Sequence, residues 1–310
     1  MSFVPLRRRE ANGGTSALSP WGVDSEFGTL RDVLIGPRDH YTWQTGNAMA
    51  RRSLRMGLGF EPTEAAAQYG EMVQAYEEAG VTCHFLEADG SLPYQVYARD
   101  SSVMTPWGPI ITQLQSPWRR GEWRAVVDFF GRNEIPVYDV VTAGSFEGGD
   151  FMVVEPGVVL CGTSGDRTSE SGIAQVRGWI EAEGWKFVSY QFDPFFLHLD
   201  VMFAMLDEKL AVLCTEAVED HLVDFLQSLN IEIIDIPFSA LMQLEVNVVA
   251  LGDGRVLLPR SSKVLKDRCR AHGLKIIDPE VSMFTAGGGG VHCMCQALRR
   301  DRVGGDNGSR

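Results

Sequence analysis

The chain has 310 residues, of which 45% are hydrophobic and 22% are charged, so it can bury a full core and is neither a disordered nor a fibrous sequence. Its formal net charge of -13 argues against nucleic-acid binding, because contacts to phosphates need clustered Lys and Arg. No stretch approaches the roughly 18 apolar residues of a membrane span. An acidic protein attracts a small cationic ligand, although acidity by itself also serves solubility.

The cysteines point to a reducing compartment. The chain has six of them, and only Cys293 and Cys295 lie close together, so the spacing indicates neither a disulfide framework nor a zinc module. We therefore expect a cytoplasmic protein without a metal site.

The elements expected along the chain follow one rhythm: a β-hairpin, an amphipathic helix and another short strand. A first strand is expected over 29–35. Hairpins with turn residues at their tips are expected over 102–114, 151–161, 201–214 and 246–258. Helices are expected over 119–132, 169–183, 218–229 and 262–272, and strands such as 136–140 and 231–236 follow them.

The residues that open the hairpins recur at a nearly fixed interval. Asp100, Asp150, Asp200, Asn247 and Cys293 are separated by 50, 50, 47 and 46 positions. A period near 50 indicates stacked or radial repeats, and a closed ring is favoured because closure removes exposed sheet edges. The hairpin starts would then meet at the central axis, with the first strand closing the ring beside the last. A coincidence within an ordinary α/β sheet is the alternative.

Three segments follow from this rhythm. Residues 1–20 are expected to be an N-terminal loop segment, because Gly, Ser and Pro are frequent in its second half. Residues 21–301 are expected to form a single catalytic domain. Residues 302–310 are polar and Gly-rich, and we expect a disordered tail there.

A run of four glycines leads directly to Cys293. Glycines allow the backbone to approach a ligand closely, so a thiol at the head of the following strand is placed as a nucleophile is. The alternative is a small buried hydrophobe beside a flexible loop. Cys295 shares the expected strand face and could replace Cys293. His292 should point to the opposite face, which makes it a poor candidate for the base.

The partners of the thiol come from equivalent positions in earlier repeats. His198 and Asp200 are two residues apart, so they should share a strand face, and a histidine oriented by a carboxylate is a common acid/base device. Glu147 and Asp100 stand at the heads of two other hairpins. Each alone is more typical of a turn or cap. Together, several carboxylates around one thiol suit a planar guanidinium cation, whose charge would lower the pKa of the thiol on binding.

With these motifs, the sequence resembles the superfamily of guanidino-group-modifying enzymes, which includes arginine deiminase, agmatine deiminase, dimethylarginine dimethylaminohydrolase and the amidinotransferases. The resemblance lies in four segments that occur in the order of the family, namely 97–100, 147–150, 198–200 and 288–293. It implies an α/β fold, a five-bladed α/β propeller (pentein) with pseudo-fivefold ββαβ repeats.

The resemblance also implies a covalent mechanism without a metal or an organic cofactor. Cys293 would attack the guanidinium carbon, and His198 would protonate the leaving amine and then activate the incoming nucleophile. Glu147 would orient His198 and bind a guanidinium nitrogen, while Asp100 and Asp200 would hold the remaining nitrogens.

These residues leave three functions open. The first is a hydrolase, of deiminase or dihydrolase type, that cleaves a C–N bond of arginine or an arginine derivative through a thiouronium on the cysteine. The second is an amidinotransferase, because Arg299 and Arg300 resemble the transferases whereas Glu147 and Gln296 resemble the hydrolases. The third is a non-catalytic propeller that binds its ligand. Arg167 lies in a segment similar to a loop that holds the substrate carboxylate. The expected partner is a small cationic guanidino substrate, and assembly with further copies of the chain is left open.

Overall fold

The computed structural model describes residues 6, 14 and 17–303, and in this part of the chain the strands form five sheets of three strands each. Four sheets share one pattern, in which an antiparallel hairpin is followed by a helix and by a third strand parallel to the second. This pattern is the predicted ββαβ repeat. The hairpins are β3 (Ser102–Thr105) and β4 (Gly108–Ile111), β6 (Phe151–Glu155) and β7 (Val158–Thr163), β9 (Phe203–Asp207) and β10 (Leu210–Leu213), and β12 (Val249–Gly252) and β13 (Arg255–Leu257).

The helices and third strands complete the four units at the predicted places. The helices are α3 (Trp123–Arg132), α4 (Glu170–Ala182), α5 (Asp220–Ser228) and α7 (Lys263–Ala271). The third strands are β5 (Asp139–Val140), β8 (Lys186–Gln191), β11 (Glu232–Asp235) and β14 (Lys275–Ile277). Short α6 (Phe238–Leu241) and α8 (Ser282–Thr285) lie in the connections.

The fifth sheet joins the two ends of the chain. Its order is β15-β1-β2, with β1 (Leu30–Ile35) antiparallel to β15 (Cys295–Arg300) and parallel to β2 (Thr82–Phe85). The prediction that the first strand lies beside the last is therefore confirmed. The predicted elements do not include α1 (Ala48–Arg55) and α2 (Pro62–Glu78), which connect β1 to β2. Asn47 caps α1 by accepting from two backbone N–H groups, and Pro62 begins α2.

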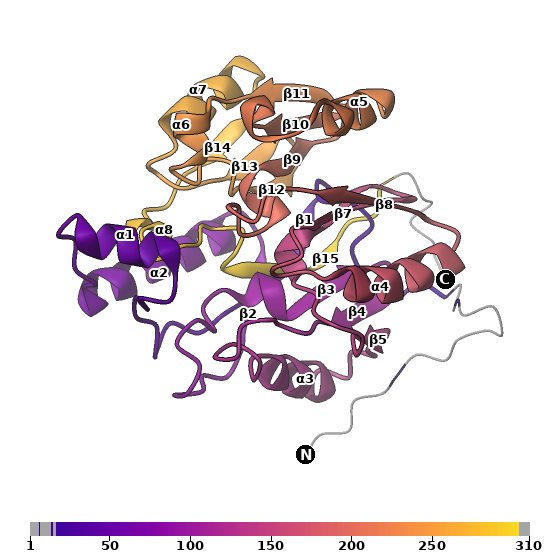
Figure 1. The fold of residues 1–310 in the computed structure, drawn as a ribbon, viewed down its shortest axis with the longest axis horizontal. Helices are drawn as coiled ribbons and strands as arrows, with labels where there is room; N and C mark the ends of the chain where they lie inside the picture. The colour runs from indigo at the N-terminus through magenta and orange to yellow at the C-terminus, as the bar shows by residue number, and fades with distance from the viewer. Residues whose placement is uncertain (1–5, 7–13, 15–16, 304–310) are drawn as a thin grey trace.

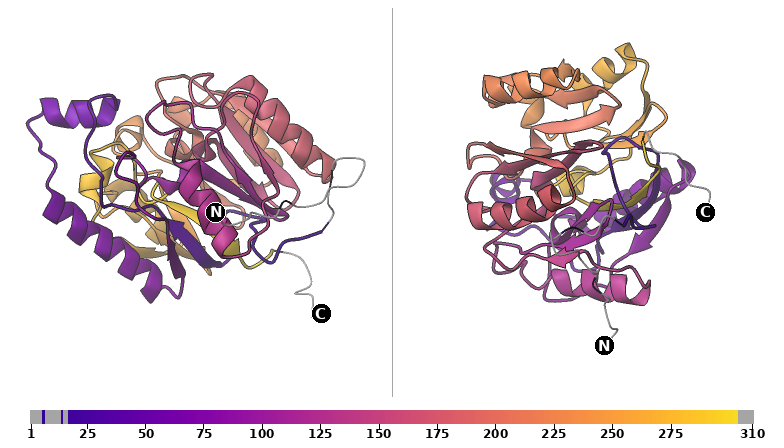
Figure 2. Two further views of the ribbon diagram at one scale, coloured as in Figure 1. Left: turned by 90° about the horizontal axis from the view of Figure 1, so that it is seen from below. Right: turned by 90° about the vertical axis from the view of Figure 1, so that its right-hand side faces the viewer.

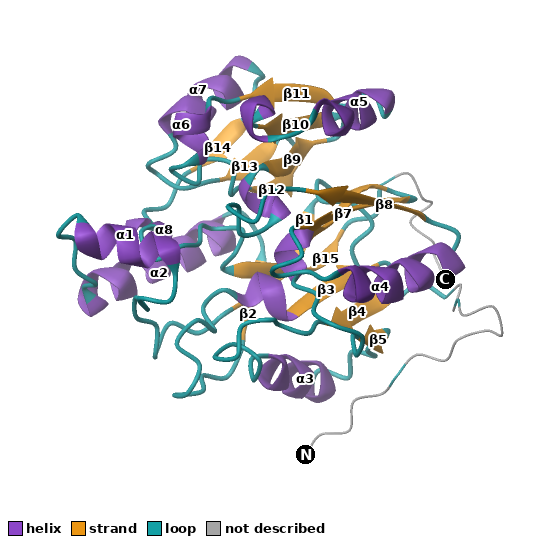
Figure 3. Ribbon diagram, in the orientation of Figure 1, coloured by secondary structure: helices purple, strands orange, loops and turns teal. Residues whose placement is uncertain are grey.

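Neighbouring sheets contact one another in succession. β15 contacts β3, β9 contacts β12, and β12 contacts β1, while short 3₁₀ turns that precede β3, β6 and β9 contact each other in turn. The helices lie on the outside, with α3 at the bottom, α4 at the right, α5 and α7 at the top and α2 at the left of Figure 1. Figure 2 and Figure 3 show the strands inside this layer of helices. Every residue of β3, β4 and β12 is buried, so both faces of these three strands contribute to the core.

The hairpin openings differ from the prediction in one respect. Asp100, Asp150 and Asp200 lie in 3₁₀ turns just before the strands (Ala98–Ser101, Gly148–Asp150 and Leu199–Val201), and Cys293 lies in a turn before β15. The expectation that these residues head strands is therefore wrong. Arguments from alternating strand faces do not apply to them, since a turn directs successive side chains differently.

Both predicted terminal segments, 1–20 and 302–310, fall largely outside the described residues. Within the described part of the chain, no helix has the length and apolar character needed to cross a bilayer.

The closing strand β1 should carry much of the stability. Leu34 is fully buried in β1, so Leu34→Ala should lower the free energy of unfolding by about 2–5 kcal/mol, measured by urea denaturation. Leu54, which is 39% exposed on α1, supplies the control, and Leu54→Ala should change the same quantity by about 0.5 kcal/mol or less. Equal losses in both variants would contradict the central place of β1.

Candidate functional site

Polar contacts connect the five repeat positions one after another. Asp100 Oδ1 accepts from the backbone N–H of Gly149 at 3.1 Å, and Asp150 Oδ1 accepts from that of Leu199 at 2.9 Å. Each carboxylate thereby binds the backbone that opens the next repeat, beside Asp150 and Asp200 respectively.

The remaining contacts return to the first repeat. Asn247 Nδ2 donates to the carbonyl of Asp200 at 3.4 Å, and Asn247 Oδ1 accepts from the backbone N–H of Cys293 at 3.3 Å. The carbonyl of Cys293 then accepts from the backbone N–H of Arg99 at 3.1 Å. The repeat positions thus lie around one centre, and the pocket that contains Cys293 opens beside it.

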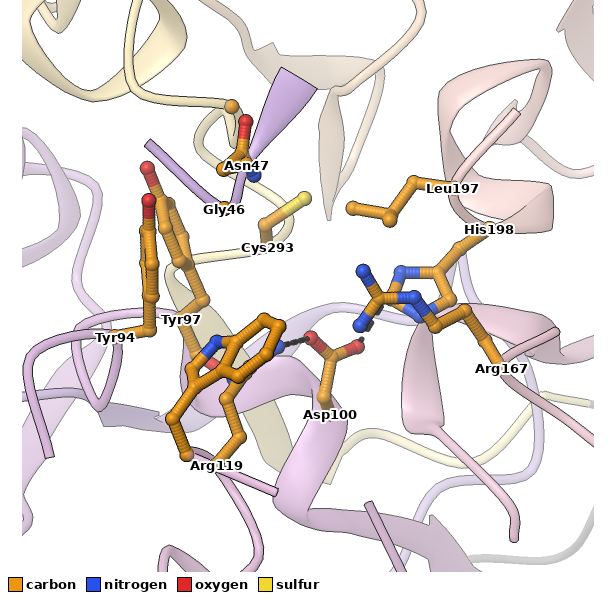
Figure 4. Close-up of a pocket in the computed structure, with 12 residues that line it drawn as sticks. Gly46, Asn47, Tyr94, Tyr97, Asp100, Arg119, Arg167, Leu197, His198 and Cys293 are labelled. Carbon is orange, nitrogen blue, oxygen red and sulfur yellow. Dashed lines mark hydrogen bonds and ion pairs between the residues drawn. The ribbon is translucent and has the colours of Figure 1, made fainter. Parts of the chain in front are cut away.

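The pocket is narrow, about 30 Å³, and it brings four of the six predicted site residues together (Figure 4). Tyr94 and Tyr97 stack on one side at 5.8 Å between ring centroids, whereas His198 and Arg167 lie on the other. A slot between aromatic rings and charged groups suits a flat cation. Its lining comprises Gly46, Asn47, Tyr94, Tyr97, Asp100, Trp118, Arg119, Arg167, Leu197, His198, Gly288 and Cys293.

The glycine run permits close approach within the protein, whereas the predicted approach to a ligand stays a prediction. A Cβ on Gly289 would lie 2.3 Å from the ring of Tyr97, and one on Gly290 would lie 2.5 Å from Asn247 Oδ1. Gly288 also has a φ of +116°, which side chains rarely adopt. These glycines let the turn that carries Cys293 pack directly against Tyr97 and Asn247.

Cys293 is 6% exposed, and its Sγ contacts two polar groups. Asn247 Nδ2 donates to Sγ at 3.1 Å, and Asp200 Oδ2 lies 3.5 Å away. Burial raises the pKa of the thiol well above its usual value, and the negative charges of Asp200 and Asp100 raise it further. The free protein therefore holds a neutral thiol, which a bound cation would help to ionise.

His198 is paired with Glu147, whose Oε2 lies 2.7 Å from the imidazole Nε2. Nδ1 lies 3.6 Å from Asp100 Oδ1. Burial opposes protonation, but the charge of Asp100 and the hydrogen bond to Glu147 raise the pKa of His198 to about 10. The imidazole is therefore protonated at neutral pH and can donate a proton. The expected pairing of His198 with Asp200 is wrong, because the 3₁₀ turn directs Asp200 towards Cys293 instead.

His292 does not point away from the site, contrary to the strand-face argument. Its Nδ1 lies 2.8 Å from Asp200 Oδ2, the same oxygen that faces Cys293. The cause is the turn at 290–295, in which Met294 N–H donates to the carbonyl of Gly290 at 3.2 Å. Neighbouring side chains in such a turn can converge on one group.

Arg119, which lines the pocket, and Asn247, which donates to Cys293 Sγ, were not among the predicted site residues. Arg119 donates to Asp100 Oδ2 at 2.7 Å and also pairs with Glu122. Although burial opposes ionisation of Asp100, His198 and Arg119 lower the pKa of this carboxyl to about 2. No motif marks Arg119, which stands in a Trp-Arg-Arg run ahead of α3. Asn247 could have been found from the sequence, because it is one of the residues that recur at the interval near 50.

Arg167 lines the pocket from the loop after β7, as the sequence predicted. Its Nη1 donates to Ser116 Oγ at 2.6 Å and lies 3.7 Å from Glu147 Oε2. It also borders an adjoining cavity of about 680 Å³, to which Phe195 and Leu244 contribute apolar surface. Arg167 therefore stands where the narrow pocket meets a wider, more apolar space.

The other residues considered from the sequence lie elsewhere. Cys295 is buried in β15, where its Sγ accepts from Tyr76 at 3.1 Å, and it is not part of the pocket lining. Arg299 pairs with Asp32 at 2.7 Å. Arg300 donates to two backbone carbonyls in the core, each at 2.7 Å. The two arginines have structural partners, so they give no support to amidino transfer.

Ligand atoms of Asp100, Glu147 and His198 lie within 4.8 Å of one another, close enough to hold a metal ion. The carboxylate oxygens already accept N–H donors, among them Gly149 and Arg119 at Asp100, and Gln115 and His198 at Glu147. These contacts suit the N–H donors of a protonated imidazole better than a metal ion. The absence of a cofactor remains a prediction from the sequence.

A family model described as N,N dimethylarginine dimethylhydrolase, eukaryotic, matches residues 47–300, well over half of the chain. The chain belongs to this family. It is also 26% identical to N(G),N(G)-dimethylarginine dimethylaminohydrolase of Mycobacterium tuberculosis over 232 residues. This alignment covers 74% of each chain. The predicted superfamily and the enzyme class, a hydrolase of C–N bonds in guanidino compounds, are thereby confirmed for this member of the N,N dimethylarginine dimethylhydrolase family.

Solved structures of the superfamily share the α/β fold of this family member. A dimethylarginine dimethylaminohydrolase of Pseudomonas aeruginosa, complexed with citrulline, matches with a TM-score of 0.73 and 21% identity over 87% of this chain and 100% of that one. The N-terminal domain of ArgZ, an arginine dihydrolase from cyanobacteria, matches with a TM-score of 0.75 and 18% identity over 88% of this chain and 99% of that one. SxtG, an amidinotransferase from Microseira wollei, matches with a TM-score of 0.76 and 15% identity over 92% of this chain and 98% of that one. At such identities the likeness shows the fold alone.

Gly149 should be essential for the placement of His198. A Cβ at this position would lie 2.7 Å from the imidazole Cγ, so Gly149→Ala should displace the ring and lower kcat by roughly 10²-fold or more, measured with a guanidino substrate. A Cβ on Gly70 in α2 would enter open space, so Gly70→Ala should leave kcat unchanged. Wild-type turnover in Gly149→Ala would show that the position of His198 does not matter.

His198 should also make stability depend on pH. Since its pKa is raised to about 10 in the folded protein, its stabilising effect is complete below its ordinary pKa of 6.5 and disappears as pH rises through about 10. The difference in the free energy of unfolding between wild type and His198→Gln should therefore shrink between these two pH values. Denaturant titrations at several pH values measure it, and parallel curves would contradict the assignment.

Proposed function

We propose that the chain hydrolyses a C–N bond in the guanidinium group of arginine or an arginine derivative through a covalent thiouronium on Cys293. The observation that carries this proposal is the buried thiol between Asn247 and Asp200, across the pocket from His198, whose imidazole is hydrogen-bonded to Glu147. The family membership supports the reaction class.

The proposed reaction has two halves. The thiolate of Cys293 forms an S–C bond to the guanidinium carbon, and the C–N bond breaks as His198 gives its proton to the leaving amine. His198 then takes a proton from water, which attacks the same carbon. The S–C bond breaks, which returns the thiolate and releases a ureido product.

Substrate charge would supply the ionisation that the free thiol lacks. The guanidinium would bind to Asp200 and Asp100, and its positive charge next to Cys293 would offset the carboxylates that raise the pKa of the thiol. Glu147 would orient His198 and keep it protonated. The nucleophile would thus form only when the correct cation is present.

Arg167 is the proposed partner of a substrate carboxylate. It lies at the opening of the pocket, 19% exposed, where the end of the substrate remote from the guanidinium would reach. Two proteins of similar fold are described with arginine or citrulline chemistry, ArgZ and the dimethylarginine dimethylaminohydrolase of P. aeruginosa. Both compounds carry an α-carboxylate, which a guanidinium side chain binds in a bidentate manner.

We further infer that residues 21–301 form one closed five-bladed α/β propeller. The cyclic contacts from Asp100 through Cys293 to Arg99 and the shared β15-β1-β2 sheet support closure. A cytoplasmic location is proposed from the cysteines, none of which is paired within the described chain.

Amidino transfer is the second candidate, because the fold is shared with the amidinotransferase SxtG. In that reaction an amine replaces water in the second half. The structural roles of Arg299 and Arg300 remove the sequence feature that favoured it, so hydrolysis is the stronger proposal.

Cys293→Ser should abolish turnover, because an alcohol lacks the nucleophilicity of a thiolate. Cys83 is only partly buried and lies outside the pocket, so Cys83→Ser is the control and should remain active. The measurement is product mass after incubation with arginine, methylated arginines and agmatine, with and without glycine. An activity that requires glycine would replace hydrolysis by amidino transfer. Turnover of none of these compounds by the wild type would overturn the proposed function.

Arg167→Ala should raise KM for arginine by roughly 10- to 100-fold, since a charged contact to the carboxylate is lost. KM for agmatine, which has no carboxylate, should change far less. Arg177 on the surface of α4 supplies a control, and Arg177→Ala should alter neither value. Equal effects of Arg167→Ala on both substrates would remove Arg167 from the site.

A further inference from the structure

His292 is buried next to Asp200, the carboxylate that faces the sulfur of Cys293. Its Nδ1 lies 2.8 Å from Asp200 Oδ2, and the two side chains are 7% and 1% exposed. Its backbone N–H donates to Asn247 Oδ1 at 3.0 Å, which fixes the turn from the other side. His292 is therefore held at both its backbone and its ring.

The two oxygens of Asp200 have different surroundings. Oδ2 receives His292 and Asn247 and faces the sulfur of Cys293. Oδ1 is buried and has no hydrogen-bond partner among the residues that the structure describes. A buried carboxylate oxygen without a donor is costly, and such atoms in native proteins usually meet a ligand, an ion or water. Oδ1 therefore lacks a donor on a carboxylate that lies 3.5 Å from Cys293 Sγ, and Cys293 lines the pocket.

His292 also lines a second, small cavity, whose lining does not include Cys293. Glu26 and Arg300 line this cavity together with apolar side chains. Glu26 is itself paired with Arg99 at 3.3 Å. Among the described residues, Asp200 is the one carboxylate within hydrogen-bond distance of His292.

We propose that His292 is a positioning residue that holds Asp200 by Oδ2, so that Oδ1 stays turned to the guanidinium of the substrate. The imidazole needs only a proton on Nδ1 for this role, and it transfers none. This inference rests on the proposed function, because it assigns the binding of the guanidinium at the same site. Loss of the donor should weaken the binding of the cation more than the chemical step.

The test uses two substitutions of similar size. His292→Asn places an amide N–H close to the position of Nδ1, whereas His292→Leu removes the donor. His292→Leu should raise KM for the guanidino substrate by roughly 10- to 100-fold with a smaller change in kcat, and His292→Asn should restore KM to within about threefold of wild type. The inhibition constant of the neutral ureido product should change by less than about threefold in both variants.

A histidine elsewhere provides the control. His272 is exposed and bonds to the carbonyl of Arg268 and to Glu232, so His272→Leu should leave KM and the inhibition constant unchanged. Thermal melting followed by circular dichroism establishes that each variant is folded, and His292→Ala replaces His292→Leu if the latter is not.

The outcomes separate the inference from the proposed function. Equal changes for cation and neutral product, or His292→Asn as impaired as His292→Leu, would overturn the inference and leave the proposed function intact. An unchanged KM in His292→Leu would also overturn the inference and leave the proposed function intact. A wild-type protein that turns over no guanidino compound would overturn the proposed function, and the inference with it.

Discussion

A circle of hydrogen bonds at the repeat starts determines the rest of this structure. Asp100, Asp150 and Asn247 each bind the backbone that opens the next repeat, and Cys293 binds the backbone beside Asp100. Buried carboxylates and amides are stable only when such partners are present. The requirement brings residues nearly 200 positions apart in the chain to within hydrogen-bond distance, and it places the nucleophile among carboxylates.

The same arrangement disfavours the thiolate form of Cys293, and a cationic substrate would counteract this effect. Asp200 and Asp100 raise the pKa of the Cys293 thiol, while Asp100 and Glu147 raise that of His198. The free site is therefore a neutral thiol opposite a charged imidazole, a state of low reactivity towards neutral electrophiles. A guanidinium would complement the carboxylates and favour the thiolate at once, so that binding and activation would be one event.

Periodicity and turn chemistry were sufficient to predict most of the fold. The hairpin tips and the interval near 50 located four repeats and the strand that closes the fifth sheet, because tight turns and buried strands have strong local preferences. The helices α1 and α2 were missed, since they interrupt that interval between β1 and β2. Their packing depends on distant contacts such as that of Gln68 with Ser282.

The site was predictable in its members but not in its pairings. Cys293, His198, Glu147, Asp100 and Asp200 do cluster, yet the partner of His198 is Glu147, and Asp200 belongs with the thiol and His292. Strand alternation failed here because the residues sit in 3₁₀ and other tight turns, whose side-chain directions are set by tertiary contacts. Arg119 could not be found from the chain at all, since its importance comes from its proximity to Asp100.

The most direct test of substrate-assisted activation is the rate of Cys293 alkylation as a function of pH. Iodoacetamide is neutral and 2-chloroacetamidine is cationic, and mass spectrometry of the labelled peptide follows both. The account predicts that the amidine labels Cys293 rapidly at neutral pH, whereas iodoacetamide reacts only as the pH approaches the raised pKa of the thiol. Equal rates for the two reagents at neutral pH, with the same pH dependence, would contradict it.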